Sequence, residues 1–557
     1  MDSTGRRSPP PHSSAAALRA LAAEPQRLRH AYGRVGLAGL AANAHVVLCA
    51  AVACLGGLLF GYDQGVVSVT LVMPQFIAVV PRIADGHPSA GFWKGFLTAL
   101  LQLGACLGAV SAGYVADRFS RRGAILAGVA WFVLGSAIQT GAVNYAMLVV
   151  GRFLGGIGIG TLSMVAPLYV SEISPPSIRG VLLGLEEFCI VFGICVAYYV
   201  NHLRLAQYRQ DSEWAWRFPF LLQIAPALLL LVGVYFLPYS PRWLATRGRR
   251  TEALAVLARL RNRPPHDSLV QAELIDILAE AQLHAEIREE RHPGANGFMR
   301  EFWSWVDCLR AGCVRRTGVG VCVMFFQQLV GINALIYYAP TLFAALGLSY
   351  DLSLIMAGVA NLCQLLGVVL SFFFIDKIGR KPLLAFGSIG TTVCLLITAV
   401  LTALFASNWP AHQVDAWVAV SMLLVYMVVF GLSWGPVPWA MPAEIFPSSL
   451  RAKGVALSTL SNWFFNFTVG LITPPLVEGT SYGAFVFFCV FAFLSIFWVL
   501  WACPETAGVP LEQLDNVFKD RTGERDRARA LRIQQQLIAE QLEKLGSVER
   551  LSGEAKD

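Results

Sequence analysis

The sequence predicts an all-α polytopic membrane protein with twelve transmembrane helices in two related six-helix halves. Three observations predict this class. Of the 557 residues, 56% are hydrophobic and only 14% are charged, and the mean hydropathy is +0.57, which is too apolar for a soluble domain. About twelve apolar segments are long enough to cross a bilayer as helices. Charged motifs also recur in the same order in the two halves of the chain.

The apolar segments lack the alternation of membrane β-strands, which excludes a transmembrane β-barrel. We place them at 44–72, 91–115, 124–143, 146–169, 178–200, 217–237, 318–346, 353–375, 382–406, 415–443, 452–475 and 481–502. The expected divisions are a disordered N-terminal tail 1–43, a first half 44–237, a linker 238–316, a second half 317–503 and a C-terminal tail 504–557.

The basic residues gather in alternate loops, after the second, sixth, eighth and tenth segments. By the positive-inside rule, these loops and both termini are expected on the cytoplasmic side, and we expect a plasma-membrane protein. Topology thus accounts for the net charge of +7, and no nucleic-acid partner is expected. The twelve cysteines contain no CxxC pair, so we expect neither disulfides, nor a metal site, nor a cofactor.

Three short motifs are duplicated in order, which indicates a repeated six-helix unit. The first reads D-[RK]-x-x-[RK]-[RK] and begins at Asp117 and again at Asp376, 259 residues later. In the second, a glutamate precedes an arginine by seven residues, at Glu172 and again at Glu444. The third pairs residues 238–242 with residues 504–506. Transporters built from two parallel halves have this layout, with the binding site between the halves at the midplane.

The duplicated charges fall at the predicted cytoplasmic ends of helices. Acids and arginines there can form ion pairs that hold helix ends together in one conformation and separate in another. The alternative is positive-inside topology with helix capping, but topology requires no acids, so we favour a gate network. The candidate gate residues are Asp117, Arg118, Arg121, Arg122, Glu172, Arg179, Arg242, Asp376, Arg380, Glu444, Arg451 and Glu505.

The segment 327–340 places Gln327, Gln328 and Asn333 at membrane depth. Buried amides need partners and offer both donors and acceptors, which suits a neutral ligand covered in hydroxyls. On a straight helix Gln327 and Asn333 lie about 240° apart, so they face one ligand only if the cavity is wide or the helix unwinds. Gly331 is where unwinding is easiest. The alternative is that these amides bond helix to helix.

The stretch 239–316 is the one long polar insert. Residues 251–260 and 268–290 have the pattern of amphipathic helices, and we expect a cytoplasmic helical bundle beneath the pore. The charged segment 521–546 is expected to be a solvated helix or disordered.

These residues resemble the sugar porter branch of the major facilitator superfamily over about 45–520. The shared motifs are Gly61-Tyr62-Asp63, the duplicated D-[RK] motif, Gly151-Arg152-Phe153, Pro238 to Trp243, Gln327 to Asn333, and Pro504-Glu505-Thr506. The sequence of residues 435–454 is most similar to that of fungal monosaccharide transporters. The resemblance implies the major facilitator fold and sugar transport by alternating access.

By resemblance, the sugar site would contain the amides Gln327, Gln328 and Asn333, the aromatic Trp439, and the pair Asn462 and Trp463. Tyr337 and Tyr338 match the family's outer gate. Two positions depart from the family and leave the substrate open. Gln364 stands where the eighth span has asparagine, and Glu187 stands where the fifth span has glutamine. We expect Glu187 to donate a hydrogen bond to sugar, with the alternative that Glu186 points inward.

Asp63 is an ionisable group at membrane depth, which marks a candidate functional site. Our first hypothesis is sugar:proton symport of a hexose or pentose, with Asp63 and Arg152 as the coupling pair. The alternatives are a facilitated-diffusion uniporter, in which this pair is purely structural, and a transporter-like sugar sensor. The sequence contains no P-loop, metal cluster or nucleophile elbow that would indicate an enzyme. We expect the carrier to function as a monomer in the lipid bilayer.

Overall fold

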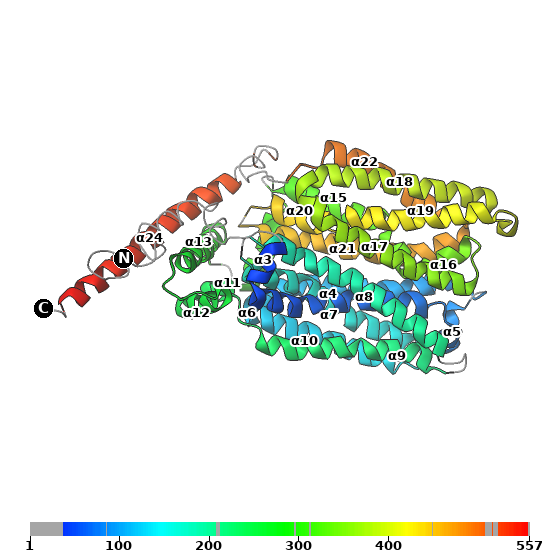
Figure 1. Cartoon of the computed structure of the whole chain (residues 1–557), viewed down its shortest axis with the longest axis horizontal. Helices are drawn as coiled ribbons and strands as arrows, with labels where there is room; N and C mark the ends of the chain where they lie inside the picture. The colour runs from blue at the N-terminus through cyan, green and yellow to red at the C-terminus, as the bar shows by residue number, and fades with distance from the viewer. Residues whose placement is uncertain are drawn as a thin grey trace.

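The structure is a computed structural model, and every regular element it describes is a helix (Figure 1). It describes residues 37–84, 86–175, 177–207, 212–294, 297–310, 313–447, 449–506, 515, 518 and 522–554. The predicted tail 1–43 therefore lies mostly outside the described residues. Only its last part is seen, and it contains the short helix α3 (Leu37–Ala42).

The first half contains the predicted apolar segments as long helices. Their bounds are α4 (Ala44–Thr70), α6 (Ala90–Thr140), α7 (Tyr145–Ile173), α8 (Arg179–Gln207), and α9 (Trp214–Leu222) continued by α10 (Ile224–Phe236). The short α5 (Pro74–Val79) and the 3-10 turn η1 (Pro81–Ile83) connect α4 to α6.

The second half repeats this arrangement, with two of its spans each divided into two helices. Its helices are α15 (Val314–Leu329), α16 (Ile332–Ala345), α17 (Tyr350–Ile378), α18 (Arg380–Phe405), α19 (Gln413–Leu432), α20 (Val437–Ile445), α21 (Arg451–Gly479) and α22 (Gly483–Trp501). The 3-10 turn η2 (Trp409–Ala411) precedes α19.

Among the described residues, eleven segments are long and apolar enough to cross a membrane. One of them, α6, has 51 residues and turns at Ser120, where φ is 78° and ψ is 163°. Its two parts return along α7, because Gly104 and Gly135 both contact the α7 backbone near Phe153 and Gly155. α6 therefore crosses twice, and the prediction of twelve crossings is confirmed.

The duplicated D-[RK]-x-x-[RK]-[RK] motif has the same backbone turn in both halves. Gly379 in the second copy has φ 99° and ψ 164°, close to the values at Ser120 in the first. Such positive φ angles favour glycine and are rare for serine. The repeat in the sequence is thus matched by a repeat in backbone conformation.

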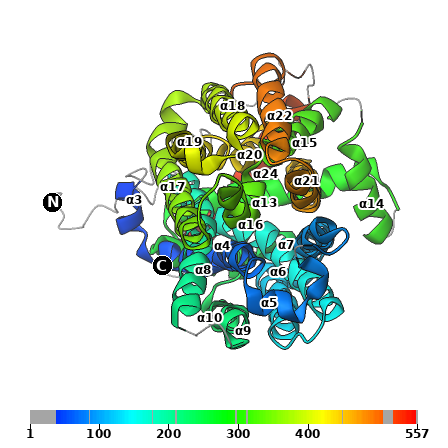
Figure 2. The same ribbon diagram turned by 90° about the vertical axis from the view of Figure 1, so that its right-hand side faces the viewer.

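The two halves lie side by side (Figure 2), with α6 against α21, α8 against α17, and α4 against α16. Glycines permit the close approach of helices within the first half, as at Gly61, which contacts the α8 backbone at Ile190. This packing follows the rule that small residues let membrane helices approach closely.

The polar insert forms α11 (Pro241–Thr246), α12 (Arg250–Arg261) and α13 (Ser268–Arg291) at one end of the bundle (Figure 1). We call this end the insert side and the opposite end the far side. Both amphipathic helices are confirmed. The insert is fastened to the first half, where Arg247 Nη2 lies 3.0 Å from the carbonyl oxygen of Asp117 and Arg261 Nη1 lies 2.8 Å from that of Ile173.

The C-terminal helix α24 (Thr522–Glu554) packs along α13 (Figure 1). Its Ile533 and Leu537 belong to one buried apolar cluster with α13 residues that include Leu283 and Ile287. Gln534 Nε2 also donates to Asp276 at 2.6 Å. A helix was one of the two expected forms. It is solvated on one side only, because an apolar stripe of α24 is buried on the insert. The helix α14 (Gly297–Asp307) follows the insert.

Candidate functional site

The seventh apolar segment breaks at Gly331, the position where unwinding is easiest. α15 ends at Leu329, α16 begins at Ile332, and Gly331 has φ 101°. The break leaves backbone carbonyls without helical partners, which is tolerated at membrane depth only where other protein groups or a cavity satisfy them. Tyr426 supplies one such partner, because its hydroxyl donates to the carbonyl oxygen of Val330 at 2.9 Å.

The Gln327 amide joins three segments of the second half. Its Nε2 donates to the carbonyl oxygens of Trp434 (2.9 Å) and Gly435 (3.1 Å), in the break between α19 and α20. Its Oε1 accepts from Asn462 Nδ2 of α21 at 2.6 Å. Two broken helices therefore meet at one buried amide.

Gln328 and Asn333 form the second amide pair, across the break at Gly331. Asn333 Nδ2 donates to Gln328 Oε1, and both side chains are buried. A straight helix would separate these side chains around its circumference, and the break brings them together. The structure thus brings four of the predicted site amides into two bonded pairs, Gln327 with Asn462 and Gln328 with Asn333. We call these four residues the amide cluster.

Glu187 of α8 faces this cluster from the first half. A Cβ atom at Gly435 would lie 3.4 Å from Glu187 Oε1, and Gly435 is a partner of Gln327. Glu186 instead packs against Gly57 of α4, where a Cβ atom would lie 3.2 Å from its Cγ. The alternative in which Glu186 points to the centre is therefore not what the structure shows.

Three residues implied by the resemblance form no described hydrogen bond with the amide cluster. Trp463 is fully buried and packs on Phe60 of α4, with ring centroids 4.9 Å apart. Trp439 is half-buried against the core of the second half. The Oε1 of Gln364 is buried with no partner among the described residues. Trp463 and Gln364 are buried and Trp439 is half-buried, but in this conformation no hydrogen bond among the described residues joins them to the amides.

On the far side, a polar cluster around Tyr337 joins the two halves, and its bonds were not predicted from the sequence. The Tyr337 hydroxyl accepts from Gln64 Nε2 of α4 at 3.1 Å and donates to Asn466 Oδ1 of α21 at 3.0 Å. The Gln102 amide of α6 lies 2.6 Å from the same hydroxyl. Tyr338 donates to the carbonyl oxygen of Gly470 at 2.7 Å. These bonds join both halves, which is what an outer gate in its closed state requires.

Asp63 and Arg152 are brought together, as expected from the resemblance. Arg152 Nη2 lies 3.5 Å from Asp63 Oδ2, with the two side chains 2% and 0% exposed. The same nitrogen lies 3.5 Å from the carbonyl oxygen of Thr98. At this distance the pair is attracted by charge but is not tightly hydrogen-bonded. The pair is therefore held mainly by Coulomb attraction, which is strong between buried charges.

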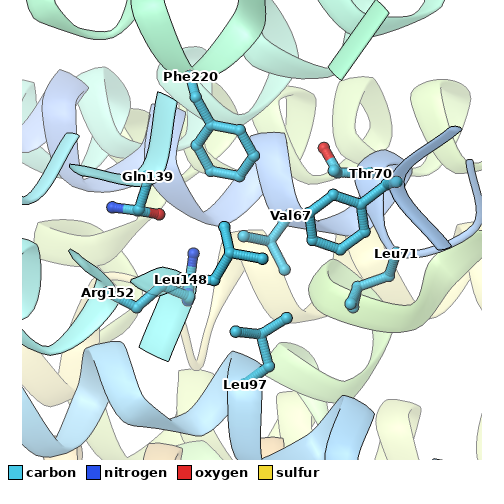
Figure 3. Close-up of a pocket in the computed structure, with 9 residues that line it drawn as sticks. Val67, Thr70, Leu71, Leu97, Gln139, Leu148, Arg152 and Phe220 are labelled. Carbon is cyan, nitrogen blue, oxygen red and sulfur yellow. The ribbon is translucent and has the colours of Figure 1, made fainter. Parts of the chain in front are cut away.

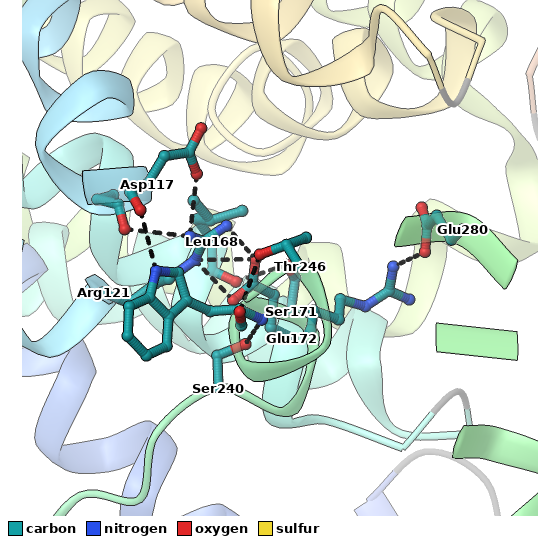
Figure 4. Close-up of polar contacts among 11 residues, drawn as sticks. Asp117, Arg121, Leu168, Ser171, Glu172, Ser240, Thr246 and Glu280 are labelled. Atoms are coloured by element: carbon teal, nitrogen blue, oxygen red, sulfur yellow. Dashed lines mark hydrogen bonds and ion pairs between the residues drawn. The ribbon is translucent and has the colours of Figure 1, made fainter. Parts of the chain in front are cut away.

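The insert-side charges of the first half form a compact network (Figure 4). Arg121 donates to Glu172 at 2.7 Å and to Asp117 at 3.0 Å. Trp243 Nε1 of α11 donates to the carbonyl oxygen of Asp117 at 3.1 Å. Arg122 donates to the carbonyl oxygen of Tyr235 at 3.1 Å. The side chain of Arg118 is exposed.

The second half has the matching network. Arg380 donates to Glu444 at 2.9 Å. The Glu505 carboxylate accepts from the backbone N–H groups of Arg380 (3.0 Å) and Lys381 (3.1 Å), and so caps the start of α18. Arg451 lies 3.5 Å from the carbonyl oxygen of Phe446.

The remaining gate candidates make contacts close to their own segments. Arg179 donates to the carbonyl oxygen of Ser174 at 3.3 Å. Arg242 pairs with Glu280 of the insert (Figure 4). Asp376 lies on α17, but its side chain is outside the described residues. The gate ion pairs among the described residues thus fall within one half or within the insert, so a gate between the halves stays a prediction for another conformation.

Replacing Arg121 by alanine should lower the free energy of unfolding by roughly 3–5 kcal/mol, since it leaves the buried Glu172 unpaired. The Arg121 side chain is 11% exposed and that of Glu172 is 5% exposed. The measurement is the thermal unfolding of the detergent-solubilised protein. Arg118→Ala is the matched control and should leave the unfolding midpoint nearly unchanged. Equal midpoints for both variants would show that the pair contributes nothing to stability.

Comparison with known proteins identifies the family to which this chain belongs. The family model described as "Sugar (and other) transporter" matches residues 49–518. The chain belongs to this family of sugar transporters. It is therefore a transporter and not an enzyme, and the resemblance recognised in its motifs is confirmed.

Two relatives and one solved structure show the range of the family. The D-xylose-proton symporter of Escherichia coli K12 is 30% identical over 502 residues, covering 85% of this chain and 95% of the symporter. A probable quinate permease of the fungus Neosartorya fischeri is 32% identical over 488 residues, covering 86% and 88% of the two chains. The structure of the major facilitator proton:xylose symporter XylE bound to 6-bromo-6-deoxy-D-glucose is 28% identical with a TM-score of 0.70, covering 86% of this chain and 100% of the other. The major facilitator fold is thereby confirmed.

Proposed function

We propose that the protein carries a monosaccharide across the membrane together with a proton, by alternating access between its two halves. The observation that carries this proposal is the amide cluster at two helix breaks, with Glu187 facing it from the other half. Amides and a carboxyl group can satisfy the many donors and acceptors of a sugar. Irregular backbone at membrane depth is expected where it borders a binding site.

The far-side polar cluster supports alternating access. Tyr337 connects α4 and α21, so entry of sugar from the far side requires its hydrogen bonds to break. We infer that the structure represents the state closed on the far side. The basic residues gather on the insert side, so we place that side and both termini in the cytoplasm, in the plasma membrane. One chain contains both halves and the site, so we propose a functional monomer.

Asp63 and Arg152 are the proposed coupling pair. Protonation of Asp63 removes the negative charge that attracts Arg152, and the guanidinium is then free to make other contacts. In a uniporter, Asp63 and Arg152 would instead form a permanent structural pair. The 3.5 Å separation favours a pair that exchanges partners over a tightly bonded structural one.

A carboxylated polyol such as quinate is the rival substrate class, because one relative is a probable quinate permease. Glu187 disfavours it, because a protonated Glu187 and the neutral amides offer no positive charge to a carboxylate ligand, which is costly to bury unpaired. A neutral hexose or pentose carries no such cost. We therefore place neutral sugars ahead of acids.

Uptake by transport-deficient cells tests the proposal. Labelled hexoses, pentoses and quinate are supplied one at a time, with and without a protonophore. We expect accumulation of at least one neutral sugar that the protonophore abolishes. Accumulation of quinate alone would move the substrate class to acids, and equilibration that ignores the protonophore would indicate a uniporter. Sugar binding without uptake would favour a sensor.

Glu187→Gln should retain pH-dependent accumulation and change the apparent sugar affinity only a few-fold. Glutamine has nearly the same shape and still donates a hydrogen bond. The measurement is uptake against sugar concentration at several pH values. Glu186→Gln is the matched control, because Glu186 packs against α4 away from the amide cluster, and it should leave the affinity unchanged.

A further inference from the structure

Beside the coupling pair lies a small cavity that the proposed transport cycle leaves without a role (Figure 3). It is lined mainly by apolar side chains from α4, α5, α6, α7 and α9. Two of its lining residues, Arg152 of α7 and Gln139 of α6, carry buried polar groups and lie on the same side of the cavity (Figure 3). An apolar cavity that contains a guanidinium group and an amide calls for an explanation, because buried polar groups are costly unless they are hydrogen-bonded.

Arg152 has more donors than partners. Its Nη2 makes the two 3.5 Å contacts with Asp63 and with the carbonyl oxygen of Thr98. Its Nε and Nη1 are buried and have no hydrogen-bond partner among the described residues. When Asp63 is protonated, even the charge attraction to that residue is lost. The guanidinium, which stays charged in proteins, then needs another acceptor within reach.

Gln139 presents the missing acceptor. Its side chain is fully buried, and its Nε2 lies 3.4 Å from the carbonyl oxygen of Gly151, one residue before Arg152. This contact directs the amide nitrogen toward α7, while Oε1 has no partner among the described residues. The other polar group in the lining, the Thr70 hydroxyl, already donates to the carbonyl oxygen of Val66 at 2.6 Å.

The other groups that face Arg152 have different roles. Asp63 faces it from α4 and the Thr98 carbonyl from α6. Tyr337 and Tyr338 of α16 lie within electrostatic range, and both hydroxyls are engaged in the far-side polar cluster. Among the described residues, Gln139 is the lining group with a buried acceptor that has no partner.

We propose that Gln139 is the second acceptor of Arg152. When Asp63 takes up a proton, the guanidinium turns into the cavity and donates to Gln139 Oε1, and it returns to Asp63 when the proton leaves. Gln139 is thus a positioning residue that stabilises the protonated state of the coupling pair. This inference depends on the proposed coupling role of Asp63 and Arg152.

The test is the pH profile of sugar accumulation by the full-length chain. Removing the acceptor with Gln139→Leu destabilises the protonated state, so half-maximal accumulation should move to lower pH by about one unit, which corresponds to 1.36 kcal/mol. Gln139→Glu should move the profile toward higher pH, because an added carboxylate attracts Arg152 and makes protonation of Asp63 easier. Opposite shifts are not what general damage to the fold would produce.

Thr70→Val is the matched control within the same cavity and should leave the pH profile in place. If Gln139→Leu fails to reach the membrane, Gln139→Met removes the acceptor while keeping an unbranched side chain. Equilibrium exchange of sugar confirms that each variant is folded. An unchanged pH profile in the acceptor-free variant, with accumulation still lost in Asp63→Asn, overturns the role of Gln139 alone. Accumulation by the unmodified chain that does not depend on pH overturns both this inference and the proposed symport.

Discussion

Asp63→Asn should abolish accumulation of sugar against its gradient while leaving exchange of sugar across the membrane intact. Asparagine keeps the size of the side chain and its acceptor oxygen, but it cannot bind or release a proton at any physiological pH. The residue that pairs with Arg152 here would then be permanently neutral, as it is in the protonated state of the normal cycle. The carrier should therefore reorient with sugar but lose the coupling that drives it uphill.

Two measurements separate these effects. Accumulation is followed in energised cells with a labelled sugar, and exchange is followed in de-energised cells preloaded with the same sugar. We expect the accumulation ratio to fall to about one, with exchange within a few-fold of the unmodified chain. If accumulation survives Asp63→Asn but is lost in Glu187→Gln, the proton is carried by Glu187 and the assignment of Asp63 is wrong.

The helical framework could be predicted because it depends on local composition. Apolar length alone located twelve crossings, and the position of Gly331 indicated the break in the seventh span. The turn at Ser120 could not be predicted in the same way, since serine gives no sign of a positive φ angle. Only its position in the duplicated motif, opposite Gly379, hints at it.

The hydrogen-bond partners of the polar residues were much harder to predict from the sequence than the depth of these residues in the membrane. Gln64, Gln102 and Asn466 are visible as polar residues in apolar segments, but nothing in their spacing shows that they meet at Tyr337. Their helices are far apart in sequence and are brought together only by the packing of the two halves. The same reason explains why the docking of α24 on α13 was missed: its partners Leu283 and Ile287 lie about 250 residues earlier.

The rest of the site could not be predicted, because its contacts depend on the conformation of the carrier. Resemblance can assign Trp463 to the sugar site, but it cannot show that in this state the ring packs on Phe60 of the other half. Likewise, the amides of the seventh span were expected to face a ligand, and here they bond to each other and to freed carbonyls. Both observations are compatible with a sugar site if the sugar takes over some of these contacts when it binds.

Gln328→Ala and Asn333→Ala should each weaken sugar binding about 5- to 150-fold, because each removes hydrogen bonds from a site that excludes water. The expected loss is roughly 1–3 kcal/mol apiece, and each 1.4 kcal/mol is about tenfold in affinity. Since the two side chains bond to each other, either replacement also leaves the remaining amide without its partner. The double variant should therefore lose less than the sum of the two single losses.

Equilibrium binding of labelled sugar to the purified, detergent-solubilised transporter measures these losses without depending on transport. Asn201→Ala is the matched control: it removes a fully buried amide of α8 whose hydrogen bond among the described residues stays within its own helix, to the carbonyl oxygen of Ala197 at 2.9 Å. It should lower thermal stability yet leave affinity unchanged. If Gln328→Ala and Asn333→Ala behave like this control, their amides serve only to join the broken helix, and the sugar site must lie elsewhere between the halves.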